Sequence, residues 1–214
     1  MTGAAGTGAS GRVANRLILA SASPRRRALL ETLGLEVQVL AADIDERQLP
    51  GEAPSEHVQR LAAAKADTIW QRPEVREAGL PVLAADTIVV IDGRVLGKPV
   101  DRSDALAMLA RLSGRAHLVL TALAVVSAAG IDSELSTTTV HFRAVSESEA
   151  AAYWNTGEPR DKAGAYGIQG LGGIFATRIE GSYTGVMGLP IAQAEAMLRR
   201  AGVHVFGGPE CKQA

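Results

Sequence analysis

Apolar runs and helix-like segments alternate along most of this chain. Continuous or alternating apolar runs predict strands at residues 17–20, 36–40, 81–91, 94–96, 117–127, 134–143, 174–179 and 203–206. Helix-start residues followed by good helix formers predict helices at 24–33, 54–70, 103–112, 146–157 and 189–201. Asp92-Gly93 and Ala129-Gly130 predict tight turns between strands. Because hairpins and helical crossovers both occur, the pattern predicts an α/β fold with a mixed sheet.

The turn after the first predicted strand collects groups that suit an anion. Ser23 is a good N-cap and Pro24 fits the first helical position. Three arginines follow, although cations at a helix N-terminus are mildly unfavourable. Hydroxyls, free backbone N–H groups and guanidinium groups together indicate a polyphosphate site. The alternative is a solvated basic face on a surface helix.

One carboxylate, Asp86, interrupts the otherwise apolar run at 81–91. Burying it costs several kcal/mol unless it is paired, protonated or bound to a metal. The hairpin that follows returns Lys98 towards the same end of the sheet. The alternatives are an ion pair between Asp86 and a core arginine, and an exposed turn position for Lys98.

The segment at 161–173 is rich in glycine and interleaves Tyr166, Ile168 and Gln169. Its glycines permit the backbone to lie close to a ligand, and an amide side chain offers both a donor and an acceptor to a base. It lacks the spacing of a dinucleotide or P-loop fingerprint. A flexible surface loop is the alternative. The four histidines show no metal-ligand spacing and are interpreted as ordinary surface or core residues.

Composition narrows the class further. The chain has 214 residues, a net charge of −1, 47% hydrophobic and 4% aromatic residues, so no membrane or nucleic-acid partner is expected. A single cysteine excludes an internal disulfide and predicts a reducing, cytoplasmic setting. Residues 1–15 are expected to be a flexible extension, 16–206 a single domain, and 207–214 a loose tail.

Several of these segments together resemble the signature blocks of Maf proteins, which are septum-formation-inhibitor-like nucleoside triphosphate pyrophosphatases. The resemblance covers about residues 17–205. The segments that carry it are Ser21-Ala22-Ser23-Pro24-Arg25-Arg26, Ala85-Asp86-Thr87, Gly97-Lys98-Pro99-Val100-Asp101, Leu112-Ser113-Gly114, residues 161–170 and Gly188-Leu189-Pro190.

The resemblance implies a fold like that of the inosine triphosphate pyrophosphatases, an elongated mixed sheet flanked by helices, with two lobes and a central cleft. It implies hydrolysis of a nucleoside triphosphate to the monophosphate and pyrophosphate with Mg²⁺ or Mn²⁺. In the family pattern Asp86 is the proton acceptor, and Glu46 with Asp86 lies at the metal. The phosphate-binding positions are Ser21, Ser23, Arg25, Arg26, Lys65 and Lys98, and those linked to base choice are Arg25, Thr87 and Gln169.

The segment at 161–170 combined with Ser182-Tyr183 looks like the subgroup that acts on dTTP and UTP. Gly97 departs from the pattern, because some relatives carry a glutamate before the lysine. A homodimer is one option, since relatives often form dimers. Two alternative functions stay open: a nucleotide-sensing or nucleic-acid-binding regulator of cell division without turnover, and a hydrolase acting on modified pyrimidine triphosphates or on many bases.

Overall fold

A computed structural model of the chain describes residues 15–205. The expected tail at 207–214 and nearly all of the expected extension at 1–15 lie outside the described residues. Strands form one seven-stranded sheet in the order β2-β1-β3-β5-β6-β7, with β4 paired to β3. Their bounds are β1 (Arg16–Leu19), β2 (Glu36–Val39), β3 (Val82–Ile91), β4 (Arg94–Leu96), β5 (Ala116–Ser127), β6 (Gly130–Phe142) and β7 (Ala176–Glu180).

The sheet is mixed, as the sequence predicts. β1 runs parallel to β2 and β3, whereas the pairs β3–β4, β3–β5, β5–β6 and β6–β7 are antiparallel. The long apolar strands β3 and β5 lie in the middle, where both faces of the sheet are covered. The predicted α/β class and the predicted turns at Asp92-Gly93 and Ala129-Gly130 are therefore confirmed.

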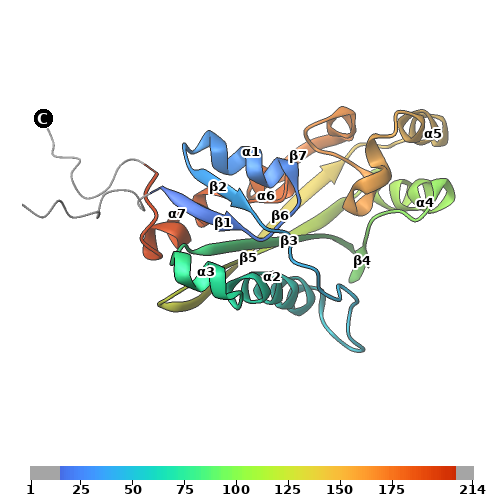
Figure 1. Cartoon of the computed structure of the whole chain (residues 1–214). Coiled ribbons are helices and arrows are strands. Elements are labelled where there is room, and N and C mark those ends of the chain that lie inside the picture. The colour runs from blue at the N-terminus through green and yellow to red at the C-terminus, as the bar shows by residue number, and fades with distance from the viewer. Residues whose placement is uncertain (1–14, 206–214) are drawn as a thin grey trace, which may run out of the picture.

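Helices divide the molecule into a larger body and a smaller lobe along the elongated sheet (Figure 1). In the body, α2 (Pro54–Trp70) and α3 (Pro73–Ala78) cover one face of the sheet, and α1 (Pro24–Thr32), α6 (Tyr183–Val186) and α7 (Ile191–Arg200) cover the other. The smaller lobe holds α4 (Arg102–Leu112), α5 (Glu147–Asn155) and three short 3₁₀ segments, Glu158–Asp161, Ala163–Ala165 and Leu171–Phe175. Three hydrophobic clusters follow this division, one on each face of the body and one in the smaller lobe.

Strand β3 changes its neighbour halfway along one edge. Val82 and Leu83 pair with β1, and residues 89–91 pair with β4 on the same side. Between them lies the stretch that contains Asp86 and Thr87, which on its other side pairs with Ala122 and Thr121 of β5. The sheet therefore opens beside the middle of β3, which is where ligands bind in many α/β sheets.

The two predicted helix starts are built as the sequence indicates. The Ser23 hydroxyl accepts a hydrogen bond from the backbone N–H of Arg26, with Pro24 at the first helical position. At α5 the Ser146 hydroxyl accepts from the N–H of Glu149, whose carboxylate accepts from the N–H of Ser146. Such reciprocal caps satisfy backbone donors that the helix itself leaves free.

The sequence prediction was wrong at three places. It missed α3 and the single turn of α6, which are six and four residues long. It also predicted a strand at 203–206, but residues 203–205 form none, and Phe206 lies outside the described residues. Instead, Val203 donates its N–H to the carbonyl of Leu198 and closes α7 together with Gly202, whose φ is +85°. The apolar character of Val203 reflects this helix cap, because its side chain packs in the core of the body. None of the helices between residues 15 and 205 is both long and apolar enough for a membrane span.

Candidate active site

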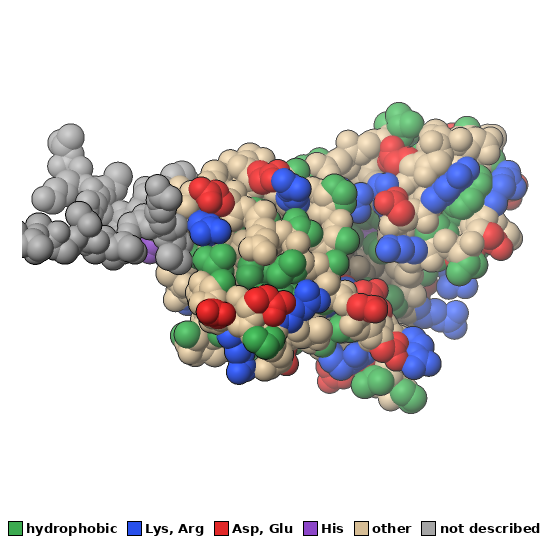
Figure 2. All heavy atoms as spheres, in the orientation of Figure 1, with side chains coloured by type: hydrophobic (Ala, Val, Ile, Leu, Met, Phe, Trp, Pro, Cys, Tyr) green, Lys and Arg blue, Asp and Glu red, His purple; other side chains and the backbone are tan. Residues whose placement is uncertain are grey.

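A cavity of about 820 Å³ lies between the body and the smaller lobe. Figure 2 shows side chains of both charges gathered around the hollow between the two parts. The cavity brings together every site residue predicted from the sequence: Ser21, Ser23, Arg25, Arg26, Glu46, Lys65, Asp86, Thr87, Lys98 and Gln169. These residues lie as far apart in the sequence as Ser21 and Gln169, so it is the fold that brings them together.

The turn between β1 and α1 forms one wall. Ser21 is buried, and its hydroxyl accepts hydrogen bonds from the N–H of Ser23 and from Nη1 of Arg26, at 3.2 and 3.0 Å. Arg26 also donates from Nε to the carbonyl of Gly188 at 2.9 Å and from Nη2 to the Thr87 hydroxyl at 3.2 Å. Arg26 therefore ties α1 to β3 and to the end of α6. Burial lowers the pKa of Arg26, while the charge of Asp86 opposes that shift.

Lys65 of α2 joins two carboxylates across the cavity floor. Its Nζ atom lies 2.6 Å from Oδ1 of Asp86 and 2.6 Å from Oε1 of Glu46. Asp86 is 8% exposed and is therefore a buried acid that needs a partner. That partner is Lys65, not the core arginine that the sequence left as the alternative. Burial raises the pKa of Glu46, but the hydrogen bond and charge of Lys65 outweigh it and hold that pKa below the ordinary value.

Glu46 lies in an irregular loop, residues 40–53, that a second set of ionic contacts holds against α2. Glu52 accepts hydrogen bonds from Nε and Nη2 of Arg60 at 2.5 and 2.9 Å, and His57 Nδ1 lies 3.1 Å from the same carboxylate. Arg60 also donates to the carbonyl of Arg47 at 3.0 Å. The hydrogen bond from Arg60 is the main reason that the pKa of Glu52 falls to about 2. These contacts fix the part of the loop that follows Glu46.

The opposite wall comes from the hairpin after β3 and from the glycine-rich segment. The N–H of Gly164 donates to the carbonyl of Gly97 at 3.0 Å, which holds Lys98 beside that segment. Gly164 has φ +68°, and a Cβ there would approach Val89 within 3.0 Å, so this close packing requires glycine. A Cβ at Gly97 would meet nothing within 4 Å, so there is room for a longer side chain at this position.

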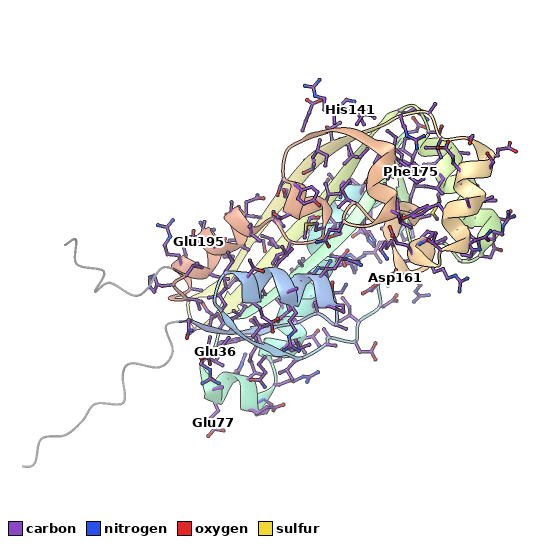
Figure 3. The ribbon with its side chains drawn as sticks, turned by 90° about the horizontal axis from the view of Figure 1, so that it is seen from above. Glu36, Glu77, His141, Asp161, Phe175 and Glu195 are labelled. Carbon is purple, nitrogen blue, oxygen red and sulfur yellow. The ribbon has the colours of Figure 1, made fainter. Side chains whose placement is uncertain are left out.

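Three residues without a role predicted from the sequence also line the cavity: His57, Glu158 and Met187. His57 had been interpreted as an ordinary histidine, yet it contacts both Glu52 and Arg60. In Figure 3, Asp161 lies on the side of the smaller lobe that faces α1, while Phe175 is turned into that lobe. The charge of Arg25 contributes to a lowered pKa of Asp161, although the hydrogen bond from Lys162 is the larger cause. Asp161 and Lys162 belong to the segment 161–173 that the sequence predicted to lie close to a ligand, although neither was given a role of its own.

The carboxylates of Glu46 and Asp86, which both contact Lys65, fit a divalent metal whose other ligands come from a substrate. Mg²⁺ in phosphate-handling sites commonly takes one or two protein carboxylates and completes its shell with phosphate oxygens and water. Glu46 and Asp86 already converge on one cationic atom. Within residues 15–205 no group of three or more His, Cys, Asp or Glu side chains is placed to hold a metal alone.

The sheet and the site together define an α/β protein whose central cleft presents arginines, lysines, hydroxyls and a lysine-bridged pair of carboxylates. The chain belongs to the family described as Maf-like protein, whose model matches residues 16–201. The dTTP/UTP pyrophosphatase of Hahella chejuensis is 48% identical over 191 residues, covering 89% of this chain and 94% of that protein. The dTTP/UTP pyrophosphatases of Methylobacillus flagellatus and Bordetella avium are 51% and 53% identical, covering 90% and 88% of this chain and 96% of each relative.

A solved structure of the Staphylococcus aureus Ham1 protein aligns with 59% of this chain and 71% of its own. The sequence identity is 13% and the TM-score is 0.39. A likeness this partial supports no conclusion about the chain.

Proposed function

We propose that the chain is a nucleoside triphosphate pyrophosphatase that hydrolyses dTTP and UTP to the monophosphate and pyrophosphate. The observation that carries this proposal is the position of Asp86, which lies in a buried strand yet faces a cavity lined by arginine, lysine and hydroxyl groups. Relatives of about 50% identity that bear the name dTTP/UTP pyrophosphatase support the same reaction and the same bases.

The phosphates are proposed to lie against the turn between β1 and α1. Pro24 has no N–H, and the N–H groups of Arg26 and Arg27 are bonded to Ser23, so the α1 N-terminus contributes mainly the partial positive charge of a helix start. Arg25 and Lys98 both line the cavity, and neither makes an ion pair with another described residue. Their charges, with the hydroxyls of Ser21 and Ser23, neutralise the triphosphate and the pyrophosphate that leaves.

Asp86 is proposed as the general base. A water oxygen forms a bond to the α-phosphorus, the bond from that phosphorus to the β-bridging oxygen breaks, and one water proton passes to the Asp86 carboxylate. Pyrophosphate departs with the electron pair of the broken bond. Lys65 keeps Asp86 oriented and itself lines the cavity, so it is proposed to contact the phosphates once it leaves Glu46. Preorganised charge of this kind is worth about 2.7–4 kcal/mol per group in the transition state.

Glu46 and Asp86 are the residues proposed to hold Mg²⁺ or Mn²⁺. A bound divalent ion supplies charge neutralisation to the phosphates and orientation to the attacking water. Without it, the same two carboxylates are neutralised by Lys65.

Base choice is proposed to rest on Gln169, Thr87 and Arg25. Gln169 is exposed on the cavity wall, at the tip of the glycine-rich segment. Its amide matches the donor and acceptor edges that uracil and thymine present. Thr87 accepts from Arg26 and lies 3.1 Å from the Thr121 hydroxyl, so its orientation is set from both sides.

Pyrophosphate release across a panel of triphosphates tests the proposal. The panel contains the canonical ribo- and deoxyribonucleoside triphosphates and modified pyrimidine forms, each with Mg²⁺ and with Mn²⁺. We expect release to be fastest with dTTP and UTP. Release from no triphosphate favours a non-hydrolytic regulator, and equal release from all bases favours a hydrolase of broad specificity.

A further inference from the structure

The segment that carries Gln169 folds around the side chain of a single acid, Glu158. One carboxylate oxygen of Glu158 accepts a hydrogen bond from the N–H of Leu171 at 2.8 Å, and the other accepts from the N–H of Gly172 at 3.1 Å. Both donors lie immediately after residues 168–170, which form the tip of the glycine-rich segment. Glu158 itself lines the cavity.

Tyr153 of α5 extends this arrangement to the other side of the tip. Its hydroxyl donates to Oε1 of Glu158 at 2.7 Å and accepts from the N–H of Gly167 at 3.0 Å. The anchored backbone groups therefore belong to Gly167 on one side of Gln169 and to residues 171–172 on the other. The tip between them is closed by a turn in which the N–H of Gly170 donates to the carbonyl of Gly167 at 3.2 Å.

The glycines of this segment lie where the anchor leaves no room for a side chain. A Cβ on Gly170 would overlap the Glu158 carboxylate, and one on Gly172 would lie 2.5 Å from the Tyr153 hydroxyl. A Cβ on Gly167 would lie 2.8 Å from the Lys162 side chain, whose Nζ donates to the Glu158 carbonyl at 2.7 Å. The backbone of the tip is thus packed directly on Glu158, Tyr153 and Lys162.

The position of Gln169 depends on these contacts because its own side chain is exposed. No described hydrogen bond from the Gln169 amide to the rest of the protein fixes it, so its direction follows from the backbone of residues 167–172. An unpaired acid at this place would be costly to bury, whereas Glu158 has donors on both oxygens. Burial raises its pKa, but the N–H groups and the Tyr153 hydroxyl outweigh that effect and leave the pKa lowered.

We propose that Glu158, through Tyr153 and the backbone of residues 167–172, is a positioning residue that sets base selection by holding Gln169 towards the nucleobase. This inference rests on the proposed function and goes beyond it, because it assigns base selection to an acid that does not itself read the base. It also predicts that phosphate binding, which lies on the α1 side of the cavity, is independent of Glu158.

The test uses the full chain with the substitution Glu158→Gln. The amide replaces one acceptor by a donor that faces a backbone N–H, so one anchor on the tip is lost. We expect KM for UTP to rise about tenfold or more with kcat little changed, because positioning is lost while the chemistry is not. The preference for UTP over GTP falls by a similar factor. The inhibition constant of tripolyphosphate, which has no base, stays the same within about twofold.

Three further variants separate positioning from stability. Tyr153→Phe removes the hydroxyl that bonds both Glu158 and Gly167 but leaves the Glu158 contacts to Leu171 and Gly172 and the ring that packs edge-on against Phe175, so a smaller change in the same direction is expected. Gln169→Glu is the positive comparison, since it alters the base contact directly. Glu149→Gln is the matched control: Glu149 is also an anchored acid of the smaller lobe, but it caps α5 and pairs with Arg143. We expect it to leave the UTP-to-GTP preference unchanged.

The inference is overturned if Glu158→Gln and Tyr153→Phe keep the UTP preference while Gln169→Glu changes it. It is also overturned if kcat falls equally for all bases with KM unchanged, or if Glu149→Gln shifts the preference as much. If Glu158→Gln does not fold, Tyr153→Phe decides. If the wild-type chain releases no pyrophosphate, the proposed function fails separately, and the ratio of UTP to tripolyphosphate dissociation constants in the same variants still decides this inference.

Discussion

The Nζ atom of Lys65 lies 2.6 Å from Oδ1 of Asp86, and both side chains are about nine-tenths buried. Asp86 lies in β3 between the residues that pair with β1 and those that pair with β4. A charge in this part of the sheet needs a partner, and here that partner is a cation which also reaches Glu46. The ion pair therefore explains how an acid persists inside an apolar strand and still faces the cavity.

The substitution Asp86→Asn tests the role of this acid in the reaction. Asparagine keeps the size of the side chain and an oxygen for Lys65, so we expect the fold and triphosphate binding to be retained. Because the proton acceptor is lost, kcat for dTTP and UTP falls by about 10²–10⁴. Steady-state release of pyrophosphate, with nucleotide binding measured by calorimetry, checks both expectations. Activity close to that of the wild type would remove Asp86 from the base role.

The substitution Lys65→Met tests what the ion pair contributes to stability. It leaves Asp86 buried without its charged hydrogen-bond donor, so we expect the free energy of unfolding to fall by about 1.5–3 kcal/mol. Urea denaturation of the nucleotide-free protein measures this change. Arg200→Met is the matched control, because Arg200 pairs with Asp132 and Glu134 at the surface with its side chain 52% exposed, and little change is expected there. Equal stability of Lys65→Met and the wild type would contradict the prediction.

His117 predicts a loss of stability in mild acid. Burial is the main cause that lowers its pKa from 6.5 to about 4, and its Nε2 atom lies 2.9 Å from the Tyr166 hydroxyl. Below pH 6.5 the unfolded chain takes up a proton at this residue, whereas the folded chain stays neutral until about pH 4. The free energy of unfolding therefore falls as the pH drops through this window, by about 3 kcal/mol at most.

The substitution His117→Gln isolates this effect, because glutamine can still bond the Tyr166 hydroxyl and does not titrate. Urea denaturation at pH 7, 6 and 5 is expected to show a steeper loss for the wild type than for the variant. Glu52 and Glu149, whose pKa values are lowered to about 2 chiefly by arginine hydrogen bonds, add their losses only below about pH 4.5. Identical pH profiles of the two proteins would exclude His117 as the cause.

The parts of the fold that local patterns specify could be predicted from the sequence. Long apolar runs identified β3 and β5, and the caps at Ser23 and Ser146 placed two helix starts. The short helix α3 was missed although Pro73 begins it and Gly79, at φ +64°, ends it. It has only six residues, which are too few to show the apolar periodicity by which a helix is recognised. Val203 was misread because an apolar residue that caps a helix looks locally like the start of a strand.

Many of the residues that line the cavity could be predicted from the sequence, but the contacts between them could not. Residue types in characteristic motifs marked Asp86, Lys98 and Gln169. That Lys65 would join Asp86 to Glu46 depends on how residues 40–53 fold back over α2, which Glu52 and Arg60 determine through side-chain contacts. The role of Glu158 was hidden for the same reason, because it acts through backbone N–H groups that no residue pattern displays.

Hydrolysis of UTP in water enriched in ¹⁸O tests the central claim most directly. Water attack on the α-phosphorus places one ¹⁸O atom in UMP and leaves pyrophosphate unlabelled, which mass spectrometry of the two products detects. We predict this result for UTP and for dTTP. Label in pyrophosphate or in orthophosphate, or no turnover of either nucleotide, would contradict the account.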